Sequence, residues 1–492
     1  MLSALSFLKD YGAESNLQIG LNVSPIFDLL TTNMIKGRVG KHKDIWFQNG
    51  GLMPINGLAG GNNTQKTGRT VRDVAALLFR FRNAVILYGD TESTLDISRL
   101  AEAVDRLFGE EGYFAANIED QRFHYMPNSA GIDGTELHNK VIEIYKTINA
   151  LSESKDKAEQ EAYKQLFIDT PFFSEKTGKN VQVMQPILFI CDSISEVMFD
   201  KLMFKQFDEG DMDEGGKKRT RDMEIGNLRR ILMTDACILG PRVGLRSYWI
   251  AQSADVINMD GKPKEKDSTF LRHNKKLAAP KVMLKLPHIG VEIIKGTVLK
   301  QPDHSVTYPR GKESTIESNA KSNPELVQYF TTVFRNKSGS SGGDISFIGS
   351  QELGILENLS MYDTLKDNKY FGLEGSAVRH SCALMPDTSI MRTTVRDMLE
   401  GPEANAKLQR AIEICYQLWY MQTFWDNFPN AWRITPSELY QKGKDAGLDW
   451  DDVLENTIYY WHDNPDVIKK HTVTVYELME ICVNGKKPYW KE

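Results

Sequence analysis

The most informative segment of this 492-residue sequence is Gly60-Gly61-Asn62-Asn63-Thr64-Gln65-Lys66-Thr67. It matches the phosphate-loop pattern G-x-x-x-x-G-K-[ST] at Gly60, Lys66 and Thr67, whereas Gln65 stands where the second glycine is expected. In such a loop, backbone N–H groups surround the phosphates, the lysine contacts the β- and γ-phosphates, and the threonine hydroxyl binds Mg²⁺. The stretch predicts a nucleotide site, although a glycine- and asparagine-rich surface turn would explain the same spacing.

The flanking segments have the pattern of a parallel α/β fold. Residues 52–59 are apolar enough for a short strand, and after the loop apolar side chains recur at helical spacing over 71–81. Two further apolar runs end in Gly89-Asp90-Thr91-Glu92 and in Asp192-Ser193. Apolar strands that end in acids and alternate with helices predict a mostly parallel sheet, with the ligand site at the carboxyl ends of its strands.

Composition narrows the class of protein. The chain is long enough for about three domains, and its contents of 41% hydrophobic and 26% charged residues are those of ordinary globular proteins. No apolar run approaches the roughly 20 residues that cross a membrane, and the first residues lack the pattern of a signal peptide. We therefore expect an intracellular protein without a membrane partner. The five cysteines are scattered without a C-x-x-C pair, which predicts buried thiols and neither a disulfide framework nor a zinc site.

Three regions are expected along the chain: a small helical segment over 1–45, an α/β core over 46–350, and a mainly helical region over 351–492. The aromatic residues between 408 and 432 fit helix packing better than base stacking. The predicted elements of the core, besides those above, are helices over 95–108, 135–166 and 224–239, a β-hairpin over 172–185, and strands over 84–88, 187–191, 247–251, 290–299, 326–334 and 345–348.

Two clusters of cations stand out in a chain whose net charge is −6. This charge argues against a uniformly basic nucleic-acid coat, so only local clusters can serve. Each cluster follows a strand of the predicted sheet, and each is either a solvated loop or a mobile loop that contacts DNA. The cations are Lys217, Lys218, Arg219 and Arg221 in the first cluster, and Arg272, Lys275 and Lys276 in the second.

Several short motifs, in their order and spacing, resemble the RecA family, and most closely its strand-exchange recombinases of the UvsX type from large tailed phages. The resemblance covers about residues 46–418 and includes the phosphate loop with its non-glycine residue at Gln65. The other segments that carry it are Tyr88-Gly89-Asp90-Thr91-Glu92, Ile187 to Ser193, Ile250-Ala251-Gln252, Val333-Phe334-Arg335-Asn336-Lys337, and the helical unit from Gly354 to Leu418.

The resemblance implies a RecA-like P-loop ATPase core that binds ATP and Mg²⁺, and it assigns roles to single residues. Glu92 would be the catalytic carboxylate, Thr67 and Asp192 would hold Mg²⁺, and Gln252 would sense the γ-phosphate. Arg335 and Lys337 would reach the nucleotide of a neighbouring protomer, which Lys66 contacts in that protomer. The two DNA-binding loops would lie near 205–222 and 254–281, which contain the two cation clusters.

The function implied is that of a DNA-dependent ATPase that forms filaments on single-stranded DNA and exchanges strands in recombination, repair and replication. Its partners would be single- and double-stranded DNA, and loading or replication proteins. Further copies of the chain would assemble with it, in a helical filament rather than a closed ring. Residues 1–45 would form a contact between protomers. The site of action would be the host cytoplasm or the phage replication compartment. Two alternatives stay open: a RecA-fold hexameric replicative helicase, against which stands the short segment before the core, and a binding protein with a decayed ATPase site.

Overall fold

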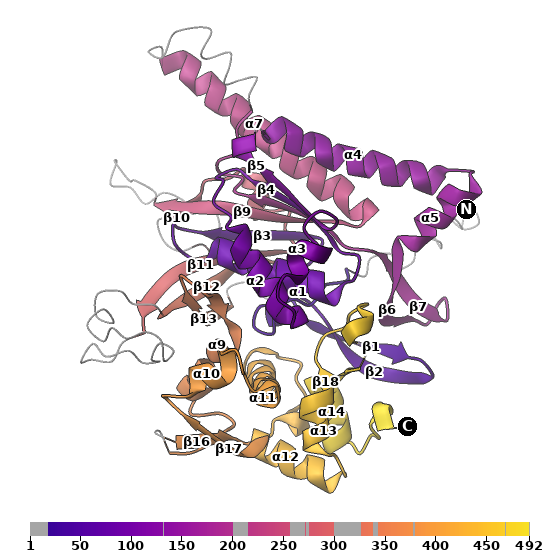
Figure 1. Cartoon of the computed structure of the whole chain (residues 1–492), viewed down its shortest axis with the longest axis vertical. Coiled ribbons are helices and arrows are strands. Elements are labelled where there is room, and N and C mark those ends of the chain that lie inside the picture. The colour runs from indigo at the N-terminus through magenta and orange to yellow at the C-terminus, as the bar shows by residue number, and fades with distance from the viewer. Residues whose placement is uncertain are drawn as a thin grey trace, which may run out of the picture.

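The computed structural model describes residues 18–130, 132–199, 215–255, 271, 275–299, 326–337, 343–376, 379–467 and 469–491. At its centre is a ten-stranded sheet with helices on both faces, and a second body of helices and short strands lies below the sheet in Figure 1. The α/β class and the mostly parallel central sheet are therefore confirmed.

The main sheet has the strand order β14-β13-β12-β11-β3-β9-β8-β4-β5, and β10 pairs with β9. The strands from β11 to β5 are parallel to one another, whereas β12, β13 and β14 continue the sheet in antiparallel fashion. The bounds are β3 Ile55–Gly60, β4 Val85–Asp90, β5 Phe123–Pro127, β8 Ile187–Asp192, β9 Leu245–Asp255, β10 Lys275–Leu277, β11 Ile289–Val298, β12 Leu326–Asn336, β13 Asp344–Ser350 and β14 Gly354–Leu356.

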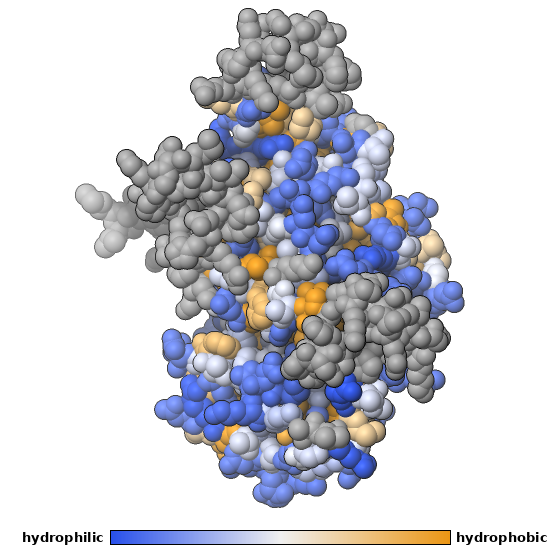
Figure 2. All heavy atoms as spheres, turned by 90° about the vertical axis from the view of Figure 1, so that its left-hand side faces the viewer, coloured by the Kyte–Doolittle hydropathy of each residue, from blue (hydrophilic) through white to orange (hydrophobic). Residues whose placement is uncertain are grey.

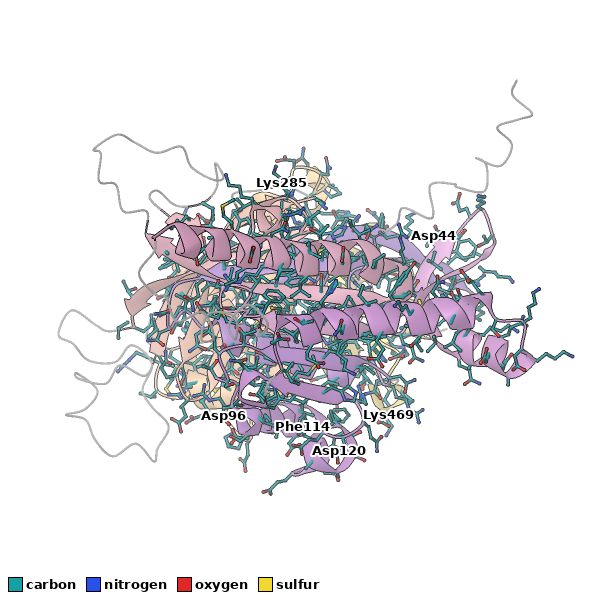
Figure 3. All side chains as sticks on the ribbon, turned by 90° about the horizontal axis from the view of Figure 1, so that it is seen from above. Asp44, Asp96, Phe114, Asp120, Lys285 and Lys469 are labelled. Atoms are coloured by element: carbon teal, nitrogen blue, oxygen red, sulfur yellow. The ribbon has the colours of Figure 1, made fainter. Side chains whose placement is uncertain are left out.

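Successive residues of the parallel strands face two separate hydrophobic cores, as the period of two in a strand requires. Leu58 and Tyr88 face the core beneath α1 and α2, whereas Ala59, Phe189 and Trp249 face the core beneath α4 and α7. Seen from above in Figure 3, α4 and α7 lie side by side across the sheet. The helices of the core are α1 Lys66–Arg80, α2 Ile97–Phe108, α3 Tyr113–Asn117, α4 Gly134–Glu153, α5 Lys157–Gln165 and α7 Gly215–Leu239.

The described part of the predicted helical segment 1–45 is mainly β structure, so that prediction is wrong there. After a short 3-10 helix at Asp28–Leu30, strands β1 Asn33–Val39 and β2 His42–Asn49 form a hairpin. This hairpin pairs with β6 Phe167–Ser174 and β7 Lys179–Met184, the β-hairpin expected over 172–185, in a four-stranded antiparallel sheet. Ile45 and Phe47 of β2 are buried and the Trp46 between them is partly exposed, whereas the exposed cations Lys36 and Lys43 follow no such alternation.

The region after residue 356 is mainly helical, as expected, but it also contains small sheets that periodicity did not reveal. The aromatic residues Tyr416, Phe428 and Trp432 are buried in it, which confirms that they serve helix packing. The elements are α9 Glu357–Asp367, β15 Leu373–Gly375, β16 Arg379–Cys382, β17 Met385–Met391, α10 Val395–Glu400, α11 Ala406–Phe424, α12 Pro436–Asp445, α13 Trp450–Asn456, β18 Thr457–Ile458, β19 His471–Thr472 and α14 Val475–Cys482.

The C-terminal end of the chain returns to the N-terminal sheet, where α14 lies against β2 (Figure 1). Glu477 Oε2 accepts a hydrogen bond of 3.1 Å from the backbone N–H of Trp46, and Thr474 Oγ1 donates one of 2.9 Å to the Trp46 carbonyl. The Trp46 indole also donates to Glu480 Oε1 at 3.1 Å. The edge of β2 is therefore covered by residues more than 400 positions away in the sequence.

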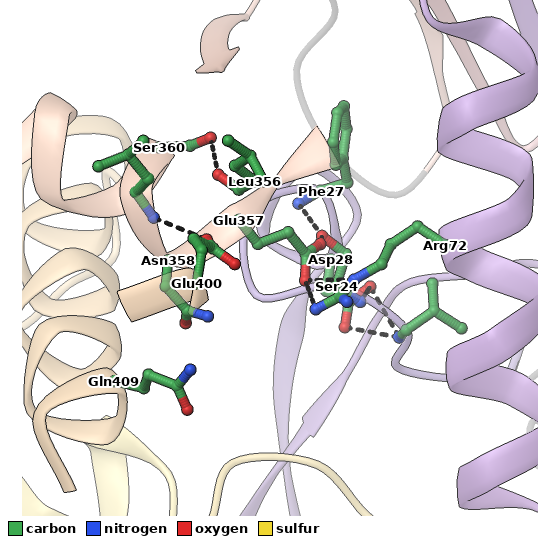
Figure 4. A network of polar contacts seen from close by, with 12 residues as sticks. Ser24, Phe27, Asp28, Arg72, Leu356, Glu357, Asn358, Ser360, Glu400 and Gln409 are labelled. Carbon is green, nitrogen blue, oxygen red and sulfur yellow. Dashed lines mark hydrogen bonds and ion pairs between the residues drawn. The ribbon is translucent and has the colours of Figure 1, made fainter. Parts of the chain in front are cut away.

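Helix α1, which follows the phosphate loop, carries charged side chains that the rest of the chain covers. Arg69 is 2.7 Å from Asp73 and its guanidinium lies 3.4 Å from the Phe27 ring centre. Arg72 forms a 2.8 Å ion pair with Glu357 of α9, at the centre of the network in Figure 4. Arg80 lies 3.6 Å from the Tyr460 ring centre. Regions on both sides of the α/β core therefore hold this helix.

The surface and the cysteines agree with the expectations from composition. Figure 2 shows hydrophilic side chains over much of the described part of one face, with apolar side chains scattered among them. All five cysteines are buried free thiols, as predicted. No helix within the described ranges has both the length and the apolar character needed to cross a lipid bilayer.

Asp28 links the N-terminal segment to the C-terminal region. Its fully buried carboxylate accepts hydrogen bonds from the N–H groups of Val23 and Ser24 and from the Tyr459 hydroxyl. Burial raises the pKa of Asp28 from 3.8 to about 7, although the nearby Arg80 and the hydrogen bonds act in the opposite direction. The folded protein thus binds this proton more tightly than the unfolded chain does.

We therefore expect the Asp28 contribution to the unfolding free energy to fall as the pH rises from about 4 to about 7. In Asp28→Asn the side chain stays neutral and this part of the pH dependence disappears. Urea unfolding of both proteins at pH 5 and at pH 7.5 measures it, and the variant should gain stability relative to the wild type at the higher pH. A stability difference that is the same at both pH values would contradict the assignment.

Candidate functional site

The phosphate loop lies at the carboxyl end of β3, between that strand and α1, as the sequence predicted. A Cβ atom at Gly60 would lie 2.4 Å from Thr64 Oγ1 and 2.8 Å from the Ile293 carbonyl oxygen, so only glycine fits where the chain leaves the strand. Within the loop, Thr64 Oγ1 and Lys66 Nζ both donate to the Gly61 carbonyl, at 2.9 and 2.7 Å. Lys66 is thus held over the loop.

Gln65 is the residue at which the loop departs from the phosphate-loop pattern. Its backbone is in the left-handed region, with φ +62° and ψ +27°, which is the conformation that favours glycine at this position. The side chain compensates for this strain with an anchor, because its amide donates a 3.0 Å hydrogen bond to the Ser350 carbonyl at the end of β13. Gln65 Cγ also passes close above Gly349, where a Cβ atom would lie 3.4 Å from it. The substitution therefore ties the loop to a neighbouring strand.

Thr67 and Asp192 meet across the sheet edge. Thr67 Oγ1 donates to Asp192 Oδ2 at 3.1 Å, and the Tyr88 hydroxyl donates to the same oxygen at 2.8 Å. Asp192 is only 5% exposed. Burial raises the pKa of Asp192 to about 6, against the effect of these two hydrogen bonds. The buried carboxylate thus sits where a cation would stabilise its charge.

Glu92 and Gln252 also meet at the carboxyl edge of the sheet, where the sequence predicted the ligand site, although β8 lies between β4, which precedes Glu92, and β9, which contains Gln252. Glu92 Oε1 accepts hydrogen bonds from Gln252 Nε2 at 3.0 Å and from Ser193 Oγ at 2.8 Å. The Gln252 backbone N–H donates to Ser195 Oγ at 2.9 Å. Glu92 follows β4, Ser193 follows β8 and Gln252 belongs to β9, so three strands orient one carboxylate.

The charges of the site interact across this edge. Burial lowers the pKa of Lys66, and the carboxylates of Asp192 and Glu92 act against that effect. Two carboxylates from different strands therefore favour the charged form of this lysine. Such an arrangement holds a cation close to where phosphates would lie along the loop.

The loop opens into a cleft of about 600 Å³ whose far walls the sequence analysis did not identify. One wall is a face of α2 and the residues before it. A second is the chain from 351 to 356, joined to α2 because Arg99 donates to the Gln351 carbonyl. The spacing of residues in the sequence gave no signal for these two walls, since their residues come together only in the fold. The lining residues missed are Arg72, Thr94, Asp96, Arg99, Glu102, Arg106, Gln351, Leu353 and Glu400.

The residues at the loop fit a magnesium ion that accompanies a nucleotide. Thr67 and Asp192 offer only oxygen ligands, and Mg²⁺ with nucleotides takes one or two carboxylates together with phosphate oxygens. Among the described residues no group of three or more His, Cys, Asp or Glu side chains could hold a metal by itself. A metal at this edge would therefore depend on phosphate ligands.

Arg335 and Lys337 lie at the opposite edge of the sheet from the phosphate loop. Arg335 pairs with Gly290, and Gly290 pairs with Gly57, which precedes Gly60 by about 10 Å along β3. Lys337 Nζ donates to the Leu286 carbonyl at 2.7 Å. Burial and the charge of Arg335 lower the pKa of Lys337. Neither residue can reach the loop of its own chain.

The predicted DNA-binding residues fall largely outside what the structure describes. The backbone of Lys217, Lys218, Arg219 and Arg221 belongs to α7, so the loop expected over 205–222 is helix from Gly215 onward, and the side chains of those four residues are not described. Arg272 lies outside the described residues. Lys275 and Lys276 belong to β10, and the Lys276 side chain is exposed. The segment 200–214 also lies outside.

In a comparison with known proteins, no protein-family model matches the chain, and no curated protein matches its sequence.

Two substitutions at Gln65 separate backbone strain from the side-chain anchor. Gln65→Ala keeps the left-handed backbone and loses the bond to Ser350, whereas Gln65→Gly loses the bond but relieves the strain. We expect the alanine variant to be less stable to unfolding than the glycine variant by about 1 kcal/mol. Hydrogen exchange over residues 350–356 should rise in both variants. Equal stability of the two variants, or unchanged exchange, would contradict the geometry described.

Proposed function

We propose that this chain is an ATP-dependent DNA recombinase that forms a helical filament on single-stranded DNA and promotes homologous pairing and strand exchange. The observation that carries the proposal is the shared hydrogen bonding of Glu92 by Ser193 and Gln252 beside the phosphate loop. Gln252 lies on β9, which continues to Asp255 and so to the predicted DNA loop over 254–281. A shift of Gln252 on DNA binding would therefore change its hydrogen bond to Glu92.

The residues of the site support ATP hydrolysis in distinct ways. Backbone N–H groups of residues 60–67 and Lys66 would hold the phosphates, and Mg²⁺ on Thr67 and Asp192 would neutralise phosphate charge when bound. Glu92 would accept a hydrogen bond from the attacking water and orient it in line with the leaving phosphate. Because Ser193 and Gln252 already fix one Glu92 oxygen, the other oxygen is the one available to water.

Arg335 and Lys337 support assembly as part of the mechanism. Since they lie at the sheet edge remote from their own loop, they can contribute a cation only to a nucleotide of another protomer. A cation supplied between subunits accelerates phosphoryl transfer in other phosphate-loop ATPases. Filament assembly on DNA would then complete the site and raise the rate of hydrolysis.

A RecA-fold hexameric helicase is the alternative that shares these features, and a non-hydrolysing binding protein is another. Electron microscopy with single-stranded DNA and a non-hydrolysable ATP analogue distinguishes the recombinase from the helicase, because a recombinase gives open filaments and a helicase gives closed rings. Measured ATPase activity excludes the non-hydrolysing protein.

Glu92→Gln should slow ATP hydrolysis at least about a hundredfold, which corresponds to roughly 3 kcal/mol of transition-state stabilisation. The amide keeps the shape of the side chain but cannot polarise water, so binding of ATP and of single-stranded DNA should remain. Steady-state ATPase assays with and without single-stranded DNA, together with nucleotide-binding titrations, measure both effects. Lys66→Ala is the comparison variant. It should lose ATP hydrolysis and also bind the nucleotide less tightly, because its contacts to the phosphates are weakened. If binding and turnover fall in parallel in Glu92→Gln, that residue is structural.

Mixing variants tests the contact between protomers. A protein with both Arg335→Ala and Lys337→Ala retains its own phosphate loop, and Lys66→Ala retains the two cations. Mixed filaments contain interfaces that combine an intact loop with intact cations, so a mixture of two inactive proteins should regain DNA-dependent ATPase activity. The wild type diluted with each variant serves as the control for mixing. No recovery at any ratio, with both proteins folded, would remove Arg335 and Lys337 from the site.

A further inference from the structure

We propose that a basic stripe remote from the ATPase cleft binds the phosphate backbone of single-stranded DNA. The stripe runs from the turn between β1 and β2 to the last residues of the described chain. It consists of Arg38, Lys41, Lys43, Lys469, Lys470, Lys487 and Lys491. That the nucleic acid is DNA rests on the proposed function, whereas the phosphate-binding surface is argued from its own contacts.

Ring contacts join the two parts of the stripe. The His42 ring lies 6.1 Å from the Tyr489 ring, and Tyr489 lies 6.1 Å from His471. His471 in turn stacks on Trp490, with ring centres 6.3 Å apart and an interplanar angle of 27°. Lys470 precedes His471, and Lys487 and Lys491 flank the two aromatic residues. Asp44 and Lys469, both labelled on the right of Figure 3, mark the two parts.

Two cations of the stripe lie against an aromatic ring before any ligand binds. The Arg38 guanidinium lies 4.7 Å from the centre of the Phe173 ring, and Lys43 Nζ lies 5.8 Å from it. Lys486 fastens the C-terminal segment to the hairpin, because it pairs with Glu477 at 2.6 Å and donates to the Asp44 carbonyl at 2.9 Å. Less conformational entropy is then lost when the surface binds.

Three nearby acids, Asp44, Glu477 and Glu480, are already engaged, which leaves an excess of positive charge on the stripe. Asp44 pairs with Lys36 at 3.6 Å, Glu477 is buried with Lys486, and Glu480 accepts from the Trp46 indole. Asp466 is exposed beside Lys469 and Lys470. Across the described residues, none of the stripe cations forms an ion pair within 4.0 Å. The local excess of positive charge contrasts with the chain's net charge of −6.

Nucleic acid is the polyanion that fits best. A row of cations matches repeated phosphates, and the partly exposed Trp490 and His471 offer rings beside it, as in proteins that bind single strands. Val39 is the large apolar side chain exposed at the hairpin, with 40% of its surface accessible. One such residue is too little for insertion into a lipid surface. We therefore assign the stripe to a single strand and not to a membrane.

The test compares two triple variants with the same change in charge. The stripe variant carries Lys41→Gln, Lys43→Gln and Lys487→Gln, and the control carries Lys146→Gln, Lys155→Gln and Lys157→Gln, which are exposed on and beside α4 and α5. Fluorescence anisotropy of labelled oligothymidylate is measured without nucleotide over a range of salt concentrations. The log-log slope should fall by about 2 in the stripe variant, about 0.7 for each phosphate that the protein no longer neutralises. The control should keep the wild-type slope.

Two results would overturn the proposal: equal slopes and affinities for the stripe variant and the control, or equally strong competition by polyglutamate of matched charge. Because the titration contains no nucleotide, it is independent of ATP hydrolysis. If the slopes agree while DNA still stimulates the ATPase, the stripe alone is wrong. If the stripe slope falls but no ATPase activity is found, the proposed recombinase function fails and the phosphate-binding surface stands.

Discussion

Charged side chains along helix α1 require partners, and those partners connect the helix to both terminal regions of the chain. An arginine taken out of water is costly unless it is paired, so the buried Arg69 and Arg80 require partners, and Arg72, whose side chain is 28% exposed, is paired as well. Those partners come from Asp73 and the Phe27 ring, from Glu357 of α9, and from Tyr459 and Tyr460 near the end of the chain. The helix that follows the phosphate loop is thereby fixed by regions outside the parallel sheet, and removal of the C-terminal region would take away these partners of Arg72 and Arg80.

This constraint also shapes the cleft. Arg72 and Glu400 both line it, although Arg72 belongs to α1 and Glu400 to the C-terminal region. Burial raises the pKa of Glu400 to about 7, against the charge of Arg72. The C-terminal region therefore contributes a wall and a titratable group to the same cavity as the phosphate loop. Any ligand that changes the position of α1 must also disturb the ion pair between Arg72 and Glu357.

Much of the sheet and of the loop chemistry could be predicted from the sequence, because both depend on local order. The apolar runs before Glu92 and Asp192 mark parallel strands, and the ends of such strands meet at one edge, so Thr67, Asp192, Glu92 and Gln252 come together as expected. The cleft walls could not be predicted in this way. Asp96, Arg99 and Gln351 have no shared motif, and it is the tertiary fold that brings residue 351, which follows β13, near α2. The β-hairpin of residues 33–49 was missed because its buried and exposed residues do not alternate regularly along the two strands.

Gln65 shows that the backbone geometry of a phosphate loop can be kept where the sequence pattern is broken. The pattern asks for glycine because the backbone turns into the left-handed region before the helix begins, and this requirement is met here by a residue that carries a strain of about 1 kcal/mol or more. A glycine could not make the bond from the side-chain amide to the Ser350 carbonyl, nor fill the space above Gly349. Since Ser350 precedes the segment that forms one wall of the cleft, the residue that breaks the pattern also joins the phosphate loop to that wall. The departure at Gln65 is therefore better explained as a gain of rigidity in this loop than as the loss of a binding site.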